Sequence, residues 1–142
     1  MIVVDTGALY AVFDRAEPRH ERFATFLTRC TEGLVTTPLV LAELDHLLGT
    51  RLGEAVRSRV MLRLSAGAIT LSPFDSPAFA RAAQVADQHS DMRLGLTDAS
   101  LMVAAARHHT TRLLTADHKH FRAVRPLDGG DDAYTLLPAD AS

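Results

Sequence analysis

The N-terminal stretch Met1-Ile2-Val3-Val4-Asp5-Thr6-Gly7-Ala8-Leu9 is the part of the sequence that says most about the fold class. Isoleucine and valine at successive positions 2 to 4 indicate a strand buried on both faces, because neighbouring side chains of a strand point in opposite directions. The mostly apolar residues from Ala8 to Phe13 predict a helix directly after this strand. A doubly buried strand that leads straight into a helix is typical of a parallel sheet, whose strands are joined by helical crossovers.

The rest of the chain repeats this alternation of strand and helix. Further strands are predicted at 34–37, 68–71 and 112–115, with a short fifth at 134–137. Helices are predicted at 18–29, 38–50, 53–65 and 76–89, and Thr97 is predicted to cap a buried apolar helix that contains 101–106. The segment 90–93 is predicted to be a loop. The sequence therefore predicts an α/β fold with a mainly parallel sheet of four to five strands and helices on both faces.

Length and composition fit one domain. The chain has 142 residues, of which 47% are hydrophobic and 23% charged. We expect residues 1–138 to form that domain and 139–142 to be a frayed tail. No apolar run approaches the roughly 18 residues of a membrane span, and the only cysteine, Cys30, can form no intrachain disulfide. A cytoplasmic protein without a membrane partner is expected.

The net charge of −2 hides an uneven distribution. Four of the 17 acidic residues lie after position 127, so residues 1–127 carry 15 basic residues against 13 acidic ones. Fourteen of the 15 basic residues are arginine, whose guanidinium suits phosphate contacts, although a general compositional bias towards arginine explains the same count. A nucleic-acid partner is therefore compatible with the sequence.

Four acidic residues stand where the predicted strands end or helices begin. Asp5 ends the first strand, Asp117 follows the strand at 112–115, and Asp98 opens the buried helix. Glu43 lies on the helix after the second strand. Ligands of such sheets gather at the carboxyl ends of the strands, so we expect these side chains to share one edge.

Each acid alone has a simpler explanation, because aspartate often caps helices and glutamate is common on solvated helix faces. The joint arrangement is harder to explain in this way. Converging carboxylates repel one another and raise one another's pKa, so a stable site needs a divalent cation between them. Hard oxygen ligands select Mg²⁺, with Mn²⁺ as the alternative, and one ion or two would both fit.

Four ordered stretches carry a resemblance to a known family. They are Val4-Asp5-Thr6-Gly7-Ala8-Leu9, Pro38-Leu39-Val40-Leu41-Ala42-Glu43-Leu44, Leu96-Thr97-Asp98-Ala99-Ser100-Leu101 and Leu113-Leu114-Thr115-Ala116-Asp117-His118-Lys119-His120-Phe121. In this order and spacing the chain resembles the PIN-domain endoribonucleases, and within them the VapC-type toxins of toxin–antitoxin pairs. The resemblance covers nearly the whole chain.

The resemblance implies a three-layer α/β/α sandwich and Mg²⁺-dependent RNA cleavage that leaves 5′-phosphate and 3′-hydroxyl ends. It also implies homodimerisation and neutralisation by a cognate antitoxin. The catalytic and metal-binding residues it implies are Asp5, Glu43, Asp98 and Asp117, with Thr6 and Thr115 as hydroxyl-bearing neighbours that orient ligands or water. Gly7 departs from the family pattern, because Ser or Asn is common there, which leaves one polar contact open.

Substrate contacts are predicted from side-chain spacing alone. Arg57, Arg59 and Arg63 give a basic helix that could follow an RNA backbone, and His46 shares a helical face with Glu43. A solvated face and plain packing are the alternatives. Zinc is disfavoured although four histidines lie at 108, 109, 118 and 120, because the first two suit a helix C-terminus and the last two belong to the family motif.

Two other function classes remain open. The first is a binding module with the same fold and a silent site. The second is an Asp-based phosphatase in which Asp5 would be phosphorylated, although such enzymes usually carry a second Asp where Gly7 stands.

Overall fold

The computed structural model of the chain describes residues 1–141, and Ser142 lies outside the described residues. Five short strands alternate with helices along the chain. The elements are β1 (Ile2–Val4), α1 (Thr6–Phe13), α2 (His20–Arg29), β2 (Leu34–Thr36), α3 (Pro38–Leu52), α4 (Glu54–Arg63), the π-helical turn η1 (Leu64–Ala68), β3 (Thr70–Leu71), α5 (Ser76–Gln88), the 3₁₀ turn η2 (Ser90–Met92), α6 (Leu96–Arg107), β4 (Arg112–Leu114), α7 (His118–Arg122) and β5 (Thr135–Leu137).

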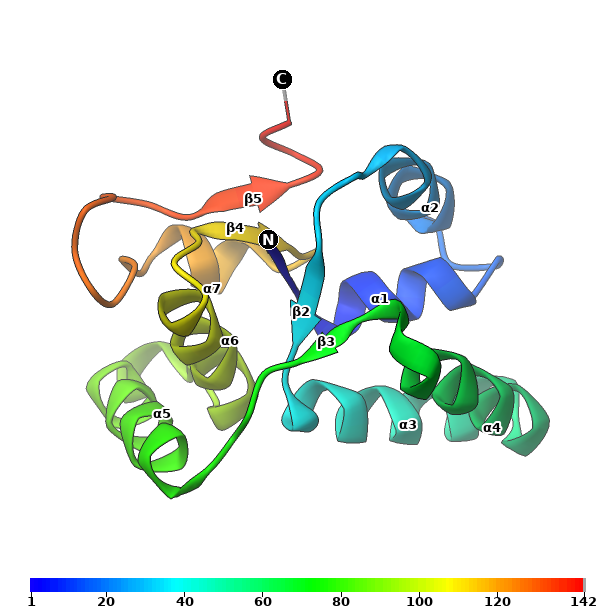
Figure 1. The fold of residues 1–142 in the computed structure, drawn as a ribbon, viewed down its shortest axis with the longest axis horizontal. Coiled ribbons are helices and arrows are strands. Elements are labelled where there is room, and N and C mark those ends of the chain that lie inside the picture. Colours follow the sequence, from blue (N-terminus) through cyan, green and yellow to red (C-terminus); the bar gives the residue numbers. More distant parts are fainter. Residues whose placement is uncertain (142) are drawn as a thin grey trace.

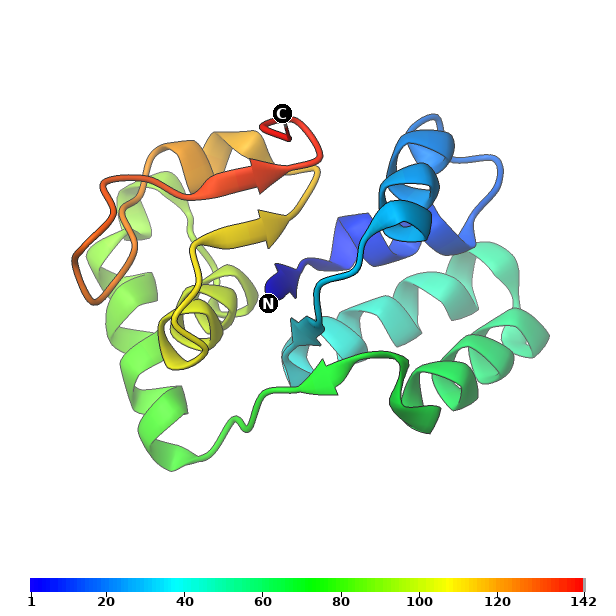
Figure 2. The same ribbon diagram turned by 45° about the horizontal axis from the view of Figure 1, so that its top comes forward.

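The five strands form one sheet in the order β3-β2-β1-β4-β5, and every neighbouring pair is parallel. Helices flank this sheet (Figures 1 and 2), which confirms the predicted α/β/α sandwich and the fifth strand. Helix α6 packs against β1 and β2, and α5 packs on α6. Helices α1 to α4 form a second group, in which α1 contacts both α2 and α3.

Strand β1 lies at the centre of the sheet because its three residues are wholly apolar. Ile2, Val3 and Val4 are fully buried, as the doubly buried pattern predicted. The two neighbouring strands pair with β1 in register, Val3 opposite Val35 on one side and Val4 opposite Leu114 on the other. Burial of this apolar surface is the main stabilising contribution to the fold.

Polar residues at the strand ends start several helices. The side chain of Thr37 accepts a hydrogen bond from the Val40 N–H at the start of α3, where Pro38 is the first helical residue. Asp75 caps α5 by accepting from the Ala78 N–H at 3.1 Å. Asp5 and Asp117 occupy the N-cap positions of α1 and α7. Two of the predicted site residues therefore have a structural role as well.

The structure corrects three details of the sequence prediction. Helix α6 begins at Leu96 with Gly95 as its N-cap, so Thr97 is inside the helix and Asp98 is its third residue. The predicted strand at 68–71 is shorter, because the π-helical turn extends to Ala68. Helix α7 had no counterpart in the prediction. Its five residues are too few to show a helical period.

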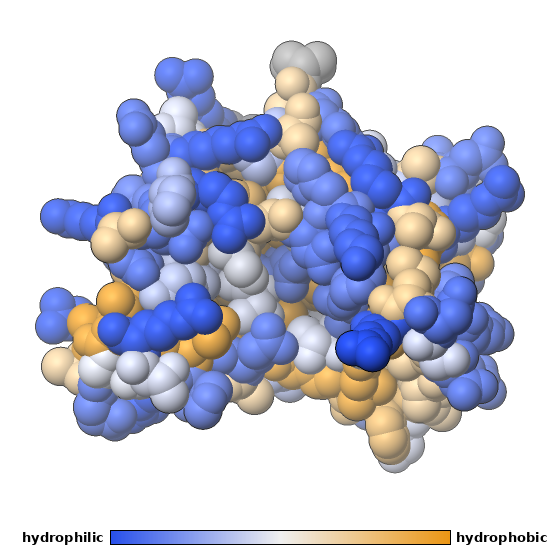
Figure 3. All heavy atoms as spheres, turned by 180° about the vertical axis from the view of Figure 1, so that it is seen from behind, coloured by the Kyte–Doolittle hydropathy of each residue, from blue (hydrophilic) through white to orange (hydrophobic). Residues whose placement is uncertain are grey.

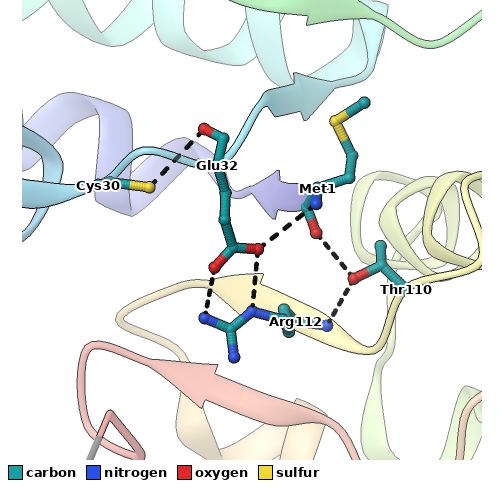
Figure 4. Close-up of polar contacts among 5 residues, drawn as sticks. All are labelled: Met1, Cys30, Glu32, Thr110 and Arg112. Atoms are coloured by element: carbon teal, nitrogen blue, oxygen red, sulfur yellow. Dashed lines mark hydrogen bonds and ion pairs between the residues drawn. The ribbon is translucent and has the colours of Figure 1, made fainter.

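Polar contacts join residues at the edge of the sheet where β1, β2 and β4 begin (Figure 4). The guanidinium of Arg112, on β4, donates to both carboxylate oxygens of Glu32, at 2.7 and 3.2 Å. The N-terminal ammonium of Met1 lies 3.4 Å from the same carboxylate, and the Thr110 hydroxyl donates to the Met1 carbonyl at 2.8 Å. These contacts tie together the chain segments that enter β1, β2 and β4, away from the predicted site.

The C-terminal segment folds back on α7. Asp140 forms an ion pair with Arg122 and accepts a hydrogen bond from the Leu136 N–H at 2.7 Å. The Ala141 N–H donates to the Pro138 carbonyl at 3.1 Å. These contacts accompany a turn over residues 138–140, and the predicted fraying of 139–141 stays a prediction. The prediction for Ser142 lies outside the described residues.

The rear face of the molecule is mostly hydrophilic (Figure 3). Figure 3 shows apolar side chains in two separate patches, at the lower left and lower right of the rear face. The large apolar residues that are exposed are Met1, Leu62, Leu71, Phe79 and Leu96. Among residues 1–141, no helix combines the length and the apolar character that crossing a membrane requires.

Candidate active site

The four predicted acids converge where the chain changes direction across the sheet. From β1 the chain proceeds outward to β2 and β3, and then returns to the other side of β1 to form β4 and β5. The carboxyl ends of β1 and β4 therefore border a crevice from which connections leave in opposite directions, a position where α/β proteins bind ligands. Asp5 directly follows β1, and Asp117 lies three residues after β4.

Asp5 is held rigidly by two hydrogen bonds. One carboxylate oxygen accepts from the Thr6 N–H at 2.6 Å, and the other accepts from the Thr115 hydroxyl at 2.8 Å. The Asp5 residue is only 8% exposed. Thr115 also accepts a hydrogen bond from the Asp117 N–H at 2.9 Å, so one buried hydroxyl connects two of the acids. The orienting role that the resemblance implied for Thr115 stays a prediction, and these hydrogen bonds are compatible with it.

Asp98 and Asp117 meet at a histidine. His120 Nδ1 lies 3.1 Å from Asp98 Oδ2 and 2.9 Å from Asp117 Oδ2. The backbone N–H of His120 donates to Asp117 Oδ1 at 3.2 Å, as expected for an N-cap residue and the third residue of its helix. Asp98 enters from α6, so two different helices contribute to this cluster.

An open cleft of about 560 Å³ contains all four acids. Its walls include Asp5, Asp98 and Asp117, and Glu43 from the exposed face of α3. Thr6 and Gly7 also line the cleft. A Cβ atom at Gly7 would lie 3.8 Å from the Ala116 Cβ, an ordinary contact, so the backbone leaves room for the side chain that is common there in the family.

The electrostatics of the cleft disfavour ionisation of Asp5 and Asp98. Burial raises the pKa of Asp5 to about 6, and the charges of Asp98 and Asp117 add to this rise against the two hydrogen bonds that lower it. Burial also raises the pKa of Asp98, and repulsion from Asp117 and, more weakly, from Glu43 adds to this rise, whereas the contact with His120 lowers it. A cation in the cleft would relieve both effects.

The donor atoms fit a divalent cation. Asp98, Asp117 and His120 each offer one ligand atom, and these atoms lie within 4.8 Å of one another. Two buried polar atoms at this site, Thr6 Oγ1 and His120 Nδ1, have no hydrogen-bond partner among the described residues. Buried polar atoms are normally satisfied, so the unpaired pair points to a species that completes the site.

Sequence reasoning missed three residues at or beside the cleft. His120 contacts Asp98 and Asp117, but in the sequence it was set aside as a zinc ligand and assigned to the family motif, because its approach to Asp98 depends on a helix that the sequence did not predict. Arg19 and Arg93 line the cleft. Arg93 has a left-handed backbone, with φ of 56°, at the end of η2, and Arg19 precedes α2. Neither arginine follows a periodic pattern, so the sequence carried no signal for them.

The residues predicted to contact substrate lie outside the cleft walls. Arg57 forms ion pairs with Asp45 and Glu54. Arg59 and Arg63 line a separate pocket of about 310 Å³ between α1 and α4. His46 is exposed on α3 and is not among the residues that line the acidic cleft. Their contact with RNA stays a prediction.

Comparison with known proteins decides the family. A family model described as the PIN domain matches residues 2–126. The chain belongs to the PIN-domain family. This PIN domain is 37% identical over 137 residues to Ribonuclease VapC26 of Mycobacterium tuberculosis (strain ATCC 25618 / H37Rv). The aligned residues cover 96% of this chain and the whole of that relative. It is therefore a PIN domain of the VapC type.

Solved structures share the fold of this PIN domain. The crystal structure of VapC20 from Mycobacterium tuberculosis, described as a toxin that cleaves the sarcin-ricin loop, has a TM-score of 0.80 at 16% identity. It covers 94% of this chain and 99% of its own. VapBC2 from Rickettsia felis, solved with a DNA fragment from its promoter, has a TM-score of 0.64 at 18% identity and covers 89% of this chain and 96% of its own.

Proposed function

We propose that this PIN domain is a divalent-metal-dependent endoribonuclease, with Mg²⁺ or Mn²⁺ as cofactor, and the toxin of a toxin–antitoxin pair. The observation that carries the proposal is the convergence of Asp5, Glu43, Asp98 and Asp117 in one cleft at the carboxyl edge of the sheet. The 37% identity to a protein named a ribonuclease supports the reaction class. A catalytically silent module has no use for a cleft of acids in which burial and neighbouring charges raise the pKa of Asp5 and Asp98.

In the proposed reaction, the cation supplies positive charge that offsets the phosphodiester charge and lowers the pKa of the attacking water. Asp5 and Asp98 are the first candidates to hold it, with Asp117 next. The hydrogen bonds from Thr6 and Thr115 fix the Asp5 carboxylate before any ion binds, which reduces the reorganisation needed on binding. Glu43 is exposed in the cleft wall, where it is free to accept the proton of the water.

Partners follow from the same proposal. The antitoxin is expected to place a basic or apolar segment in the acidic cleft and so exclude RNA. The protein is further proposed to be a homodimer and to act in the cytoplasm, where RNA substrate and antitoxin are made. Reduced access to the cleft carboxylates in the complex, measured by carboxyl-directed chemical labelling and mass spectrometry, is the expected result. A complex that leaves all four acids accessible contradicts this binding mode.

Cleavage of labelled RNA tests the proposed activity. The purified protein is expected to cut a mixed RNA pool in Mg²⁺ or Mn²⁺, to lose this activity in excess EDTA, and to regain it when the ion is restored. A matched assay with a small phosphate monoester tests the phosphatase alternative. Turnover of the monoester without any action on RNA would overturn the proposal in favour of that alternative.

Arg93 is predicted to bind the phosphate backbone of the RNA. It lines the cleft, is exposed, and forms no ion pair with residues 1–141, whereas Arg19 donates to Glu17 at 2.9 Å. Arg93→Ala is expected to raise KM about tenfold with little change in kcat, because a phosphate contact contributes about 1–2 kcal/mol of binding. The slope of log(kcat/KM) against log(salt) is expected to fall by about one.

Two further variants make the Arg93 result specific. Arg107→Ala removes an exposed arginine at the end of α6 and is expected to leave KM unchanged. Arg59→Ala combined with Arg63→Ala tests the basic helix α4. If the α4 double variant raises KM while Arg93→Ala does not, RNA follows α4 and the assignment of Arg93 is wrong.

A further inference from the structure

His120 is oriented by contacts outside the carboxylate cluster. Its Nε2 lies 3.1 Å from the carbonyl oxygen of Met92. A carbonyl oxygen only accepts, so Nε2 must carry the hydrogen and donate it. In the neutral ring this leaves a lone pair on Nδ1, the nitrogen that faces Asp98 and Asp117.

The Nδ1 atom is in an unusual position. It lies within 3.1 Å of two carboxylate oxygens, yet it has no hydrogen-bond partner among residues 1–141. In the neutral ring this lone pair is directed at two negatively charged groups and is repelled by both, whereas a protonated ring would form an ion pair with them. A cation shared by Nδ1 and the two carboxylates removes this repulsion and uses all three donors.

The scaffold holds His120 for this role. The short helix α7 is capped by Asp117 and anchored by Phe121, which is 1% exposed and packs edge-on against the Tyr134 ring at 6.2 Å. A carbonyl on the far ring nitrogen is the arrangement that fixes the ring of a metal-ligating histidine and increases its basicity.

We propose that His120 Nδ1 is a direct ligand of the divalent ion, beside Asp98 and Asp117, and that it makes the site favour Mn²⁺ over Mg²⁺. Mg²⁺ prefers oxygen ligands throughout, whereas a site that includes imidazole nitrogen suits a transition metal better. This inference rests on the proposed function, because it concerns the same cleft. It adds a ligand and an ion preference that the four carboxylates alone do not give.

Electron spin-echo spectroscopy of Mn²⁺ bound to the protein tests the ligand without measuring activity. The wild-type protein is expected to show the coupling of a directly bound nitrogen, and ¹⁵N-labelling of histidine is expected to change its frequency. His120→Gln keeps an amide N–H for the Met92 carbonyl and removes the Nδ1 donor. It is expected to abolish the nitrogen coupling and to weaken Mn²⁺ binding about tenfold or more.

Two controls separate the possible outcomes. His118→Gln changes a neighbouring histidine that is outside the cluster, and it is expected to keep both the nitrogen coupling and the Mn²⁺ affinity. Calorimetric titration with Mg²⁺ is expected to show a smaller loss for His120→Gln than titration with Mn²⁺. Unchanged thermal unfolding of His120→Gln in EDTA shows that the variant is folded.

Mn²⁺ that binds the wild-type protein without nitrogen coupling overturns the His120 assignment but leaves the carboxylate site intact. If neither Mn²⁺ nor Mg²⁺ binds to the wild-type protein or to His120→Gln, this inference and the metal dependence of the proposed function are both overturned. RNA cleavage without any bound ion would contradict the proposed function alone.

Discussion

Replacement of Asp98 by asparagine is expected to lower RNA cleavage by at least two to three orders of magnitude, because loss of a metal-binding carboxylate removes several kcal/mol of transition-state stabilisation, and each 1.36 kcal/mol is tenfold in rate. Asp98 is the third residue of α6, is partly buried, and its carboxylate lies 3.1 Å from His120 Nδ1. Asparagine has nearly the same shape, so the fold should persist. Single-turnover cleavage of a labelled RNA measures the effect.

Asp87→Asn is the matched control for Asp98→Asn. Asp87 is exposed on α5 and belongs to no ion pair within the described part of the chain, so its loss should leave the cleavage rate within about twofold. Circular dichroism and thermal unfolding confirm that both variants are folded. Normal RNA cleavage by Asp98→Asn would show that the site is assigned to the wrong residues.

Replacement of Asp5 by asparagine is expected to stabilise the metal-free protein at neutral pH. Burial raises the pKa of Asp5 in the folded state to about 6, above the unfolded value of 3.8. The folded state therefore binds more protons than the unfolded state between those values, and stability falls as pH rises from about 4 to about 6. Above that window the ionised Asp5 costs about 3 kcal/mol, the equivalent of roughly two pKa units.

Denaturant unfolding in EDTA at several pH values checks this prediction. Asp5→Asn should unfold with a free energy about 1–3 kcal/mol higher than the wild-type protein at pH 7, and the difference should vanish near pH 4. Added Mn²⁺ should stabilise the wild-type protein and reduce the difference. Asp14→Asn is the control that is expected to lower the free energy of unfolding at neutral pH, because the hydrogen bond from the Tyr10 hydroxyl lowers the pKa of Asp14. Equal stability of Asp5→Asn and wild type at both pH values contradicts the account.

Much of the site was predictable because it is built on regular elements. Parallel strands end at one edge of a sheet, so an acid after β1 and an acid after β4 had to approach one another. Val4 pairs with Leu114, which places Asp5 next to Thr115. Glu43 follows from the same logic, since α3 starts at the end of β2. The alternation of strands and helices along the chain carries this information in the sequence, whereas the position of β4 directly beside β1 comes from the structure.

The remaining parts of the site depend on local geometry that the sequence does not encode in a period. His120 reaches Asp98 only because five residues after Asp117 form a helix. Arg93 lines the cleft and has a left-handed backbone itself, at the end of a 3₁₀ turn that the sequence predicted only as a loop. Gly95 caps α6 although Thr97 is the better capping residue by type, because the backbone is already helical at Leu96.

Mass spectrometry of the RNA ends tests the central proposal most directly, because it reports which nucleophile attacks the phosphodiester. A water activated at the carboxylate cleft leaves a 5′-phosphate on one product and a 3′-hydroxyl on the other. Cleavage in Mg²⁺ or Mn²⁺ is expected to give these ends, and to persist when the ribose 2′-hydroxyl at the cleavage site is replaced by hydrogen. Products that carry a 2′,3′-cyclic phosphate and a 5′-hydroxyl would contradict the proposal, because the 2′-hydroxyl would then be the nucleophile.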